Sequence, residues 1–244
     1  MYDDLDRPPL RARALDRALS GDGWRVQLLA ETDSTNAVVA ERARAGEPAG
    51  LVVVAESQTA GRGRLDRSWV SPPRAGLTFS VLLRPDPGLL GWQSLLGGVA
   101  VARAVREVAQ VQAVLKWPND VLVDGKKLCG LLTEVPVSGA VVLGIGLNVT
   151  TRADELPHAG ATSLQLVGAV TVDREPLLKS MLRHLARAGG PGDYRALCST
   201  IGRRVRLELP GGTAVEGVAD DVDAGGRLVV DGTAYAAGDV VHLR

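Results

Sequence analysis

The chain has 244 residues, 45% of them hydrophobic, which is enough for one substantial core and a small second domain. Basic and acidic residues number 28 each, so no overall charge attracts nucleic acid or an anionic membrane. The acidic N-terminus MYDDLDRPPL carries no export signal, and Cys129 and Cys198 lack metal-ligand spacing. We therefore expect a compact enzyme of the reduced, cytoplasmic compartment with no membrane segment.

Apolar residues recur at helical spacing in the N-terminal half of the chain. Three helices are predicted, over 11–19, from a cap at Asp33 or Ser34 to Gly46, and over 89–109. Short apolar runs at 51–55 and 77–83 predict buried strands, separated by a glycine-rich basic segment. Gly97 and Gly98 indicate that the third helix packs closely against the sheet.

The middle of the chain predicts antiparallel strands and one more helix. Residues 121–135 contain Asp124-Gly125, a two-residue hairpin signal between apolar runs, and 140–149 offers a further strand. A helix over 173–189 carries Pro176 in its first turn and ends at a glycine pair. This helix is expected to cover one face of the sheet.

Beyond Ile201 the sequence changes to short strands separated by glycine-rich turns. The predicted strands are 205–209, 215–219, 228–230 and 240–243. This spacing predicts a small β-barrel. We place the boundary near Thr200, which gives a catalytic domain over 1–200 and a barrel domain over 201–244.

The loop Gly61-Arg62-Gly63-Arg64 has the composition of an anion-binding loop. Gly61 and Gly63 let the backbone approach a ligand closely, while Arg62 and Arg64 supply planar forks that fit carboxylate or phosphate. A solvated basic turn is the alternative for the same residues. The loop is therefore a candidate site only in combination with its neighbours.

Two residues that flank this loop could contact the same ligand. Gln58 follows a buried strand and offers both a hydrogen-bond donor and an acceptor to an amide-like group. Trp69 lies in a polar, proline-bearing segment, where its indole could stack on a planar ring such as adenine. Trp69 could equally be an anchor of the core.

Two further groups of basic residues are candidates for phosphate binding. Lys116 ends an apolar strand, from which a point charge can reach phosphate oxygens, although the residues Pro118-Asn119-Asp120 that follow can also be read as a simple turn. Lys126 and Lys127 follow the hairpin turn, where lysines are usually solvated. Gly130, in the next strand, marks a close backbone approach.

Other chemistries have little support in the sequence. The loop at Gly61 lacks the third glycine of a dinucleotide fingerprint, because position 66 is Asp, and Gly144-Ile145-Gly146 has Val149 at the corresponding place. Walker A and G-x-S-x-G motifs are absent from the sequence. The histidines are scattered, at His158, His184 and His242. Hydrolase and zinc chemistry are therefore not expected.

Five short segments, taken together and in this order, resemble the biotin protein ligase family. They are ETDSTN, ESQTAGRGR, KWPND, GKKLCG and GIGLNV. The resemblance spans Trp24 to roughly Leu166 and is weaker beyond. It is closest to the short class without a DNA-binding head, and it implies an α+β fold with a mixed, mostly antiparallel sheet flanked by helices, followed by a small C-terminal β-barrel. Cys129 departs from the alanine common in the family.

The resemblance also implies roles for individual residues. Ser34, Thr35 and Gln58 would bind the ureido group of biotin. The loop arginines would bind the carboxylate and, together with Lys116, the phosphates. The expected catalytic residues are Arg62, Lys116 and Lys127, and the expected substrate-binding residues are Ser34, Thr35, Asn36, Gln58, Gly61, Arg62, Gly63, Arg64, Trp69, Lys116, Asn119, Gly130 and Asn148, with no metal-binding residue.

The implied reaction is ATP-dependent formation of biotinyl-5'-adenylate, with Mg²⁺ on the polyphosphate, followed by transfer of biotin to a lysine of the biotin carboxyl carrier domain of a carboxylase. A lipoate or octanoate ligase of related architecture is the nearest alternative. A non-catalytic binding module or repressor is an alternative from another class, although the neutral charge and the missing head favour no nucleic-acid partner. The resemblance leaves a homodimer open.

Overall fold

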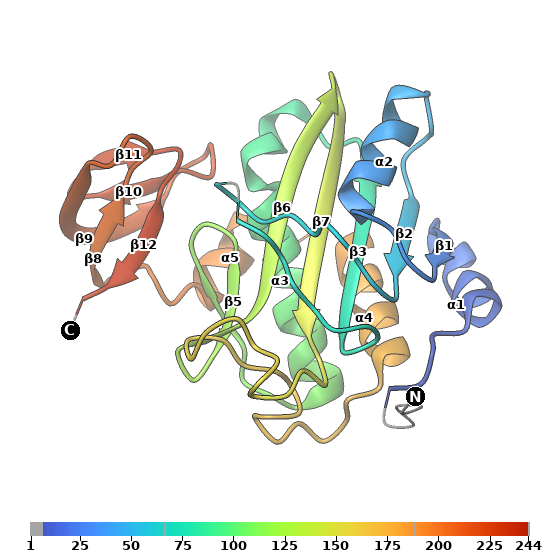
Figure 1. Ribbon diagram of the computed structural model, residues 1–244. Coiled ribbons are helices and arrows are strands. Elements are labelled where there is room, and N and C mark those ends of the chain that lie inside the picture. Colours follow the sequence, from blue (N-terminus) through green and yellow to red (C-terminus); the bar gives the residue numbers. More distant parts are fainter. Residues whose placement is uncertain (1–6, 66, 188, 244) are drawn as a thin grey trace.

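The computed structural model describes residues 7–65, 67–187 and 189–243, which form a seven-stranded sheet with a smaller sheet beside it (Figure 1). The strands of the large sheet are β1 Arg25–Leu29, β2 Leu51–Ala55, β3 Gly76–Leu83, β4 Val114–Lys116, β5 Asp120–Val123, β6 Lys126–Val137 and β7 Ala140–Asn148, in the order β1-β2-β3-β7-β6-β5-β4. β1 and β2 are parallel, whereas the other neighbours are antiparallel. The predicted mixed, mostly antiparallel sheet is confirmed.

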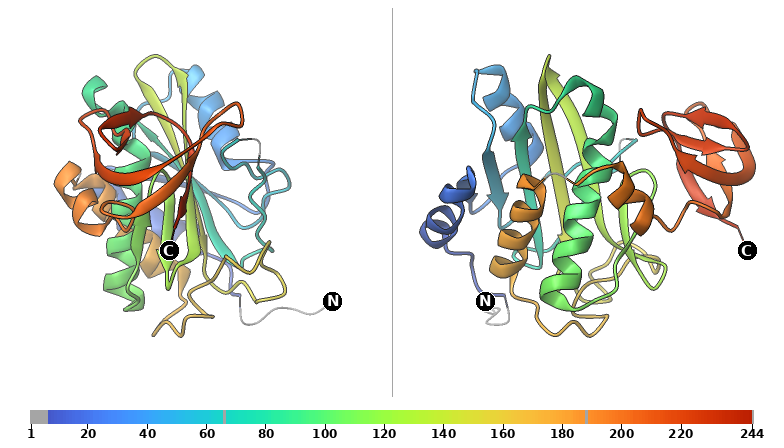
Figure 2. Two further views of the ribbon diagram at one scale, coloured as in Figure 1. Left: turned by 90° about the vertical axis from the view of Figure 1, so that its left-hand side faces the viewer. Right: turned by 180° about the vertical axis from the view of Figure 1, so that it is seen from behind.

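Helices cover both faces of the large sheet (Figure 2). They are α1 Ala12–Leu19, α2 Thr35–Arg44, α3 Gln93–Ala104, α4 Arg174–Ala186 and α5 Pro191–Leu197, with 3-10 turns η1 Ser20–Asp22 and η2 Pro87–Trp92 and a π turn η3 Val105–Ala109. α2 packs on one face, and α3 and α4 pack on the other. The four predicted helices are confirmed, and α5 is an element that the sequence did not predict.

The strand period of two divides the side chains of β3 between these faces. Leu77, Phe79 and Val81 belong to the large core with α3 and α4, whereas Leu82 belongs to the smaller core beneath α2. Ser80 points to the α2 side, where its hydroxyl contacts residues of that helix. The α2 face of the central strands therefore accommodates polar side chains, and the candidate site lies there.

The segment Pro87–Ala109 is long and apolar enough to cross a membrane by length and composition, with a mean hydropathy of 1.2 over its most apolar window. In the fold, 61% of that window is buried. A Cβ on Gly97 would lie 2.8 Å from side-chain atoms of both Leu131 and Leu143. The segment is thus a core helix in close contact with the sheet, as its small residues predicted.

The smaller sheet is antiparallel throughout and follows the order β11-β10-β9-β8-β12. Its strands are β8 Arg204–Glu208, β9 Ala214–Val222, β10 Leu228–Val230, β11 Thr233–Tyr235 and β12 Asp239–His242. β11 was not predicted. The expected C-terminal β structure is confirmed, but its strand pairing is open and not a closed barrel, because the short β11 pairs only with β10 and β12 pairs only with β8.

The two sheets meet through a turn between β9 and β10. The indole Nε1 of Trp92 donates to the carbonyl of Ala224 at 2.8 Å, and that of Trp117 donates to the carbonyl of Gly226 at 3.1 Å. Arg195 on α5 pairs with Asp221 at 2.6 Å. Since Trp117 directly follows Lys116, this turn contacts the side chain of the residue next to a predicted catalytic residue.

Candidate active site

A cavity of about 510 Å³ lies beside the N-terminus of α2, over β6 and β7. Every predicted site residue except Gly61 lines it, and these residues are Ser34, Thr35, Asn36, Gln58, Arg62, Gly63, Arg64, Trp69, Lys116, Asn119, Lys127, Gly130 and Asn148. Gly61 does not line the cavity but lies directly against a residue that does. A Cβ at Gly61 would lie 2.6 Å from Nε2 of Gln58. It lets the loop pack against the strand end that carries Gln58.

One end of the cavity is a network of uncharged polar groups. Oε1 of Gln58 accepts from the backbone N–H of Thr35 at 2.8 Å and from its hydroxyl at 3.1 Å, which satisfies one of the free donors at the start of α2. The hydroxyls of Thr35 and Ser80 are 2.7 Å apart, and Ser80 donates to Oδ1 of Asn36 at 2.6 Å. Sequence reasoning missed Ser80, although a serine within an apolar strand signals a buried partner.

Glu134 on β6 joins this network to the glycine-arginine loop. Nδ2 of Asn36 donates to Glu134 at 2.6 Å, and both terminal nitrogens of Arg62 lie 3.0 Å from its carboxylate. Arg62 is still 45% exposed. The guanidinium is therefore held at the cavity mouth, where an entering ligand can reach it.

Trp69 forms a wall of the cavity and is not an anchor of the core. Its ring lies against Gly130 and Gly146, which are cross-strand partners on β6 and β7. A Cβ would lie 3.3 Å from the ring at Gly130 and 2.7 Å from Nε1 at Gly146. Gly144, two residues earlier on the same strand face, makes room for Asn36 in the same way. The sequence placed Gly144 and Gly146 in the segment GIGLNV and in a failed nucleotide motif, but neither was predicted as a site residue.

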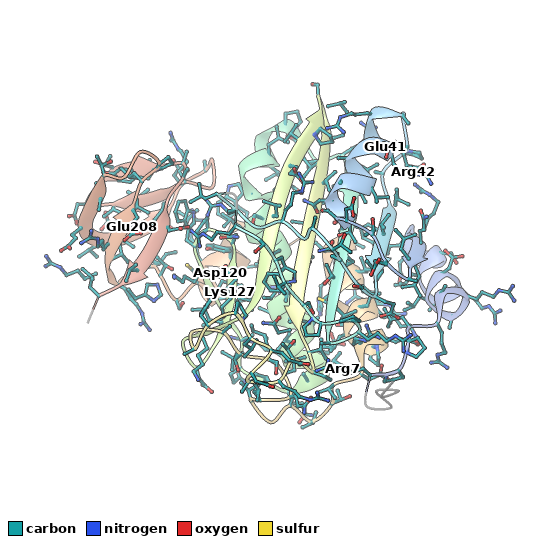
Figure 3. The ribbon with its side chains drawn as sticks, in the orientation of Figure 1. Arg7, Glu41, Arg42, Asp120, Lys127 and Glu208 are labelled. Carbon is teal, nitrogen blue, oxygen red and sulfur yellow. The ribbon has the colours of Figure 1, made fainter. Side chains whose placement is uncertain are left out.

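The opposite end of the cavity is cationic, and most of its cations have carboxylate partners. Nζ of Lys127 lies 2.6 Å from Asp120 (Figure 3). Arg67, which was not among the predicted site residues, pairs with Asp239 on β12. Arg64 lies 3.8 Å from the same carboxylate and donates to Oδ1 of Asn119 at 3.3 Å.

Lys116 differs from these cations, because it forms no ion pair with any residue that the structure describes. Burial lowers the pKa of Lys116; the carboxylate of Asp120 opposes this, and the like charges of Lys127 and Arg67 add to it. A partly desolvated ammonium without a partner is well suited to bind an anion.

The predicted residues Asn119 and Asn148 line the cavity but are also bound to the protein. Nδ2 of Asn119 donates to the carbonyl of Leu131 at 2.7 Å, and Nδ2 of Asn148 donates to the carbonyl of Thr162 at 2.9 Å. Cys129 is buried in the large core and does not line the cavity, and burial raises the pKa of its thiol, which stays protonated. The departure at Cys129 therefore brings no reactive group to the cavity.

Thr200 links the strand end at Lys116 to β12. Its Oγ1 accepts from the backbone N–H of Trp117 at 3.2 Å and lies 3.1 Å from Nε2 of His242. The hydroxyl of Thr200 can donate to Nε2 of His242 or accept from it, depending on the tautomer of the imidazole. Burial, together with the charges of Lys116 and Arg203, lowers the pKa of His242 to about 4.

His242 should make stability depend on pH. In the unfolded chain its imidazole takes up a proton near the usual pKa of about 6.5, whereas in the fold it stays neutral until about pH 4. The unfolded state binds more protons between these values, so stability falls as the pH is lowered through this range. The free energy of unfolding, measured with urea, should fall less between about pH 7 and about pH 5 for His242→Gln than for the wild type. An equal decrease in both proteins would contradict this prediction.

An uncharged polar end, an aromatic wall and a cationic end in one cavity define a site for a small ring system that carries an anionic group. Residues 28–149 match the model of the biotin/lipoate A/B protein ligase family, and residues 200–243 match the biotin protein ligase C-terminal domain. The chain belongs to this family, and it is a ligase. The resemblance inferred from the five motifs is thus confirmed.

Relatives of known activity span nearly the whole chain. A biotin acetyl-CoA-carboxylase ligase of Mycobacterium tuberculosis is 44% identical, covering 99% of this chain and 98% of that protein. The corresponding ligase of Paracoccus denitrificans is 33% identical over 85% of this chain and 94% of that protein. The biotin protein ligase from Aquifex aeolicus in complex with biotin and ATP superposes with a TM-score of 0.72 at 29% identity, covering 90% of this chain and 98% of that chain.

Proposed function

We propose that this chain activates biotin with ATP to form biotinyl-5'-adenylate and transfers biotin to a lysine of the biotin carboxyl carrier domain of a carboxylase. The observation that carries the proposal is the position of Lys116, a cation without an ion-pair partner among the described residues, in the same cavity as the polar network of Gln58 and Thr35. The polar network is suited to a ureido group, and Lys116 is suited to an anion.

In the first step a biotin carboxylate oxygen forms a bond to the α-phosphorus of ATP. The bond from that phosphorus to the oxygen of the β-phosphate breaks, and pyrophosphate leaves with the electron pair. Two anions must approach each other, and Arg62, Arg64 and Lys116 offset their repulsion. Mg²⁺ enters with the nucleotide as part of the substrate, and no group of three His, Cys, Asp or Glu side chains able to hold a metal occurs among the described residues.

In the second step the neutral amine of the acceptor lysine attacks the acyl carbon, and AMP leaves with the electrons of the acyl-oxygen bond. We assign Asp120 as the group that takes the amine proton, since its carboxylate borders the cavity, and Lys127, 2.6 Å away, holds it in place. Lys127 would then neutralise the departing phosphate. Trp69, on its glycine platform, would cover the planar part of the ligands.

The remaining parts of the proposal concern the whole chain. We place the domain boundary near Thr200, between α5 and the first strand of the smaller sheet. We expect the protein to be located in the cytoplasm. Nucleic-acid binding is not part of the proposal, because the 28 basic and 28 acidic residues provide no overall positive charge. The oligomeric state is left open, with a homodimer as one state to test.

One incubation tests the proposed reaction. The protein is mixed with biotin, MgATP and a biotin carrier domain, and the carrier is weighed by mass spectrometry while pyrophosphate is assayed. We expect one added biotinyl group per carrier and one pyrophosphate per turnover. Calorimetry with biotin and with lipoate separates the two acids that the family model covers, and tighter binding of lipoate would contradict the assignment.

A further inference from the structure

Asp239 brings a carboxylate from the smaller sheet to the cationic end of the cavity. It is the first residue of β12 and lines the cavity, with 30% of its side chain exposed. It pairs with Arg67 and lies 3.8 Å from Nη1 of Arg64, which also donates to the carbonyl of the preceding Gly238 at 3.4 Å. The start of β12 therefore holds Arg64 of the glycine-arginine loop and Arg67, which follows that loop.

The guanidinium groups of Arg64 and Arg67, which Asp239 holds, are also suited to bind phosphate. A guanidinium binds carboxylate and phosphate through the same planar fork, so one arginine cannot serve both fully at once. Arg64 is also partly buried. This burial lowers its pKa and increases the stabilisation that an anionic partner provides. Lys116, by contrast, forms no ion pair with a carboxylate among the described residues.

We propose that Asp239 competes with the nucleotide phosphates for Arg64 and Arg67 and so sets the affinity of the site for ATP. This inference rests on the proposed function, because it takes ATP as the ligand of the cationic end. Asp239 acts through the arginines and does not touch the reacting atoms. When the triphosphate enters, its oxygens replace the Asp239 carboxylate on the two guanidinium groups, and the cost of breaking that contact is subtracted from the nucleotide affinity.

Glu208 offers a matched control. It lies on β8 of the smaller sheet (Figure 3), is the cross-strand partner of Asp239 and borders the same cavity, so neutralising either residue removes one negative charge from neighbouring positions of that sheet. Among the described residues Glu208 pairs with Arg206, at 3.7 Å, and with neither Arg64 nor Arg67. Comparing the two variants separates direct competition for Arg64 and Arg67 from a general effect of net charge.

The test is calorimetric binding of an ATP analogue with a methylene bridge between the α- and β-phosphates, in the presence of Mg²⁺. Asp239→Asn and Asp239→Ser should bind the analogue about two- to fivefold more tightly than the wild type, whereas Glu208→Gln should show a clearly smaller change. In adenylate formation, the KM for MgATP should fall in the Asp239 variants, but the KM for biotin should not.

Two results would overturn the inference. Weaker or unaltered analogue binding in both Asp239 variants would show that Asp239 supports the loop and does not compete with the nucleotide. Equal gains in Asp239→Asn and Glu208→Gln would assign the effect to net charge alone. Failure of the wild-type protein to bind biotin and the analogue would contradict the proposed function itself, which keeps the two tests distinct.

Discussion

Lys116→Ala is expected to lower the rate of biotinyl-adenylate formation by roughly a hundred- to a thousandfold, which corresponds to about 3 to 4 kcal/mol of lost transition-state stabilisation. The ammonium is partly buried and has no ion-pair partner among the described residues, so an entering phosphate does not have to displace a bound carboxylate from it. Pyrophosphate release with saturating biotin and MgATP measures the effect. Transfer from supplied biotinyl-adenylate should fall as well.

Lys126 provides the control for this variant. Lys126 lies at the start of β6 with an exposed side chain and does not line the cavity, so Lys126→Ala removes an equal charge from outside the site. Its rate should stay close to that of the wild type, and circular dichroism should show both variants folded. Normal adenylate synthesis by Lys116→Ala would contradict the role assigned to this lysine.

Arg62→Ala should leave the fold intact and reduce adenylate formation by about a hundredfold or more. The side chain is 45% exposed, and an ion pair such as that with Glu134 contributes little to stability, so the loss should appear in the rate and not in the melting temperature. The measurement is again pyrophosphate release, combined with thermal unfolding.

Two variants show whether Arg62 acts on the substrates or through the polar network. Glu134→Gln keeps the guanidinium but removes its carboxylate partner, and it should slow the reaction much less than Arg62→Ala. Arg42→Ala removes an exposed arginine of α2, away from the pair Asp120 and Lys127 (Figure 3), and should have no effect. Equal losses in Arg62→Ala and Glu134→Gln would assign Arg62 a purely structural role.

The sequence predicted most of the cavity, because its residues lie in short motifs at strand ends and turns. Glu134 and Asp239 were not predicted. Each occurs in an ordinary strand sequence without a local signal, and only the pairing of distant strands brings it to Arg62 or Arg67. Gly130 was predicted as a close approach, but its pairing with Gly146 into one platform was not, since one glycine opposes the other only once β6 and β7 pair.

Helices α1 to α4, the hairpin of β5 and β6, and the short strands β8, β9, β10 and β12 followed from the sequence alone, because periodicity, caps and turn residues are local properties of the chain. Only the tertiary structure decided the parallel pairing of β1 with β2, the existence of α5 and β11, and the open edge of the smaller sheet. These elements are short or lie at edges, so long-range packing and not local pattern determines them. The same long-range packing decides that β12, far from the motifs in sequence, contributes to the cavity.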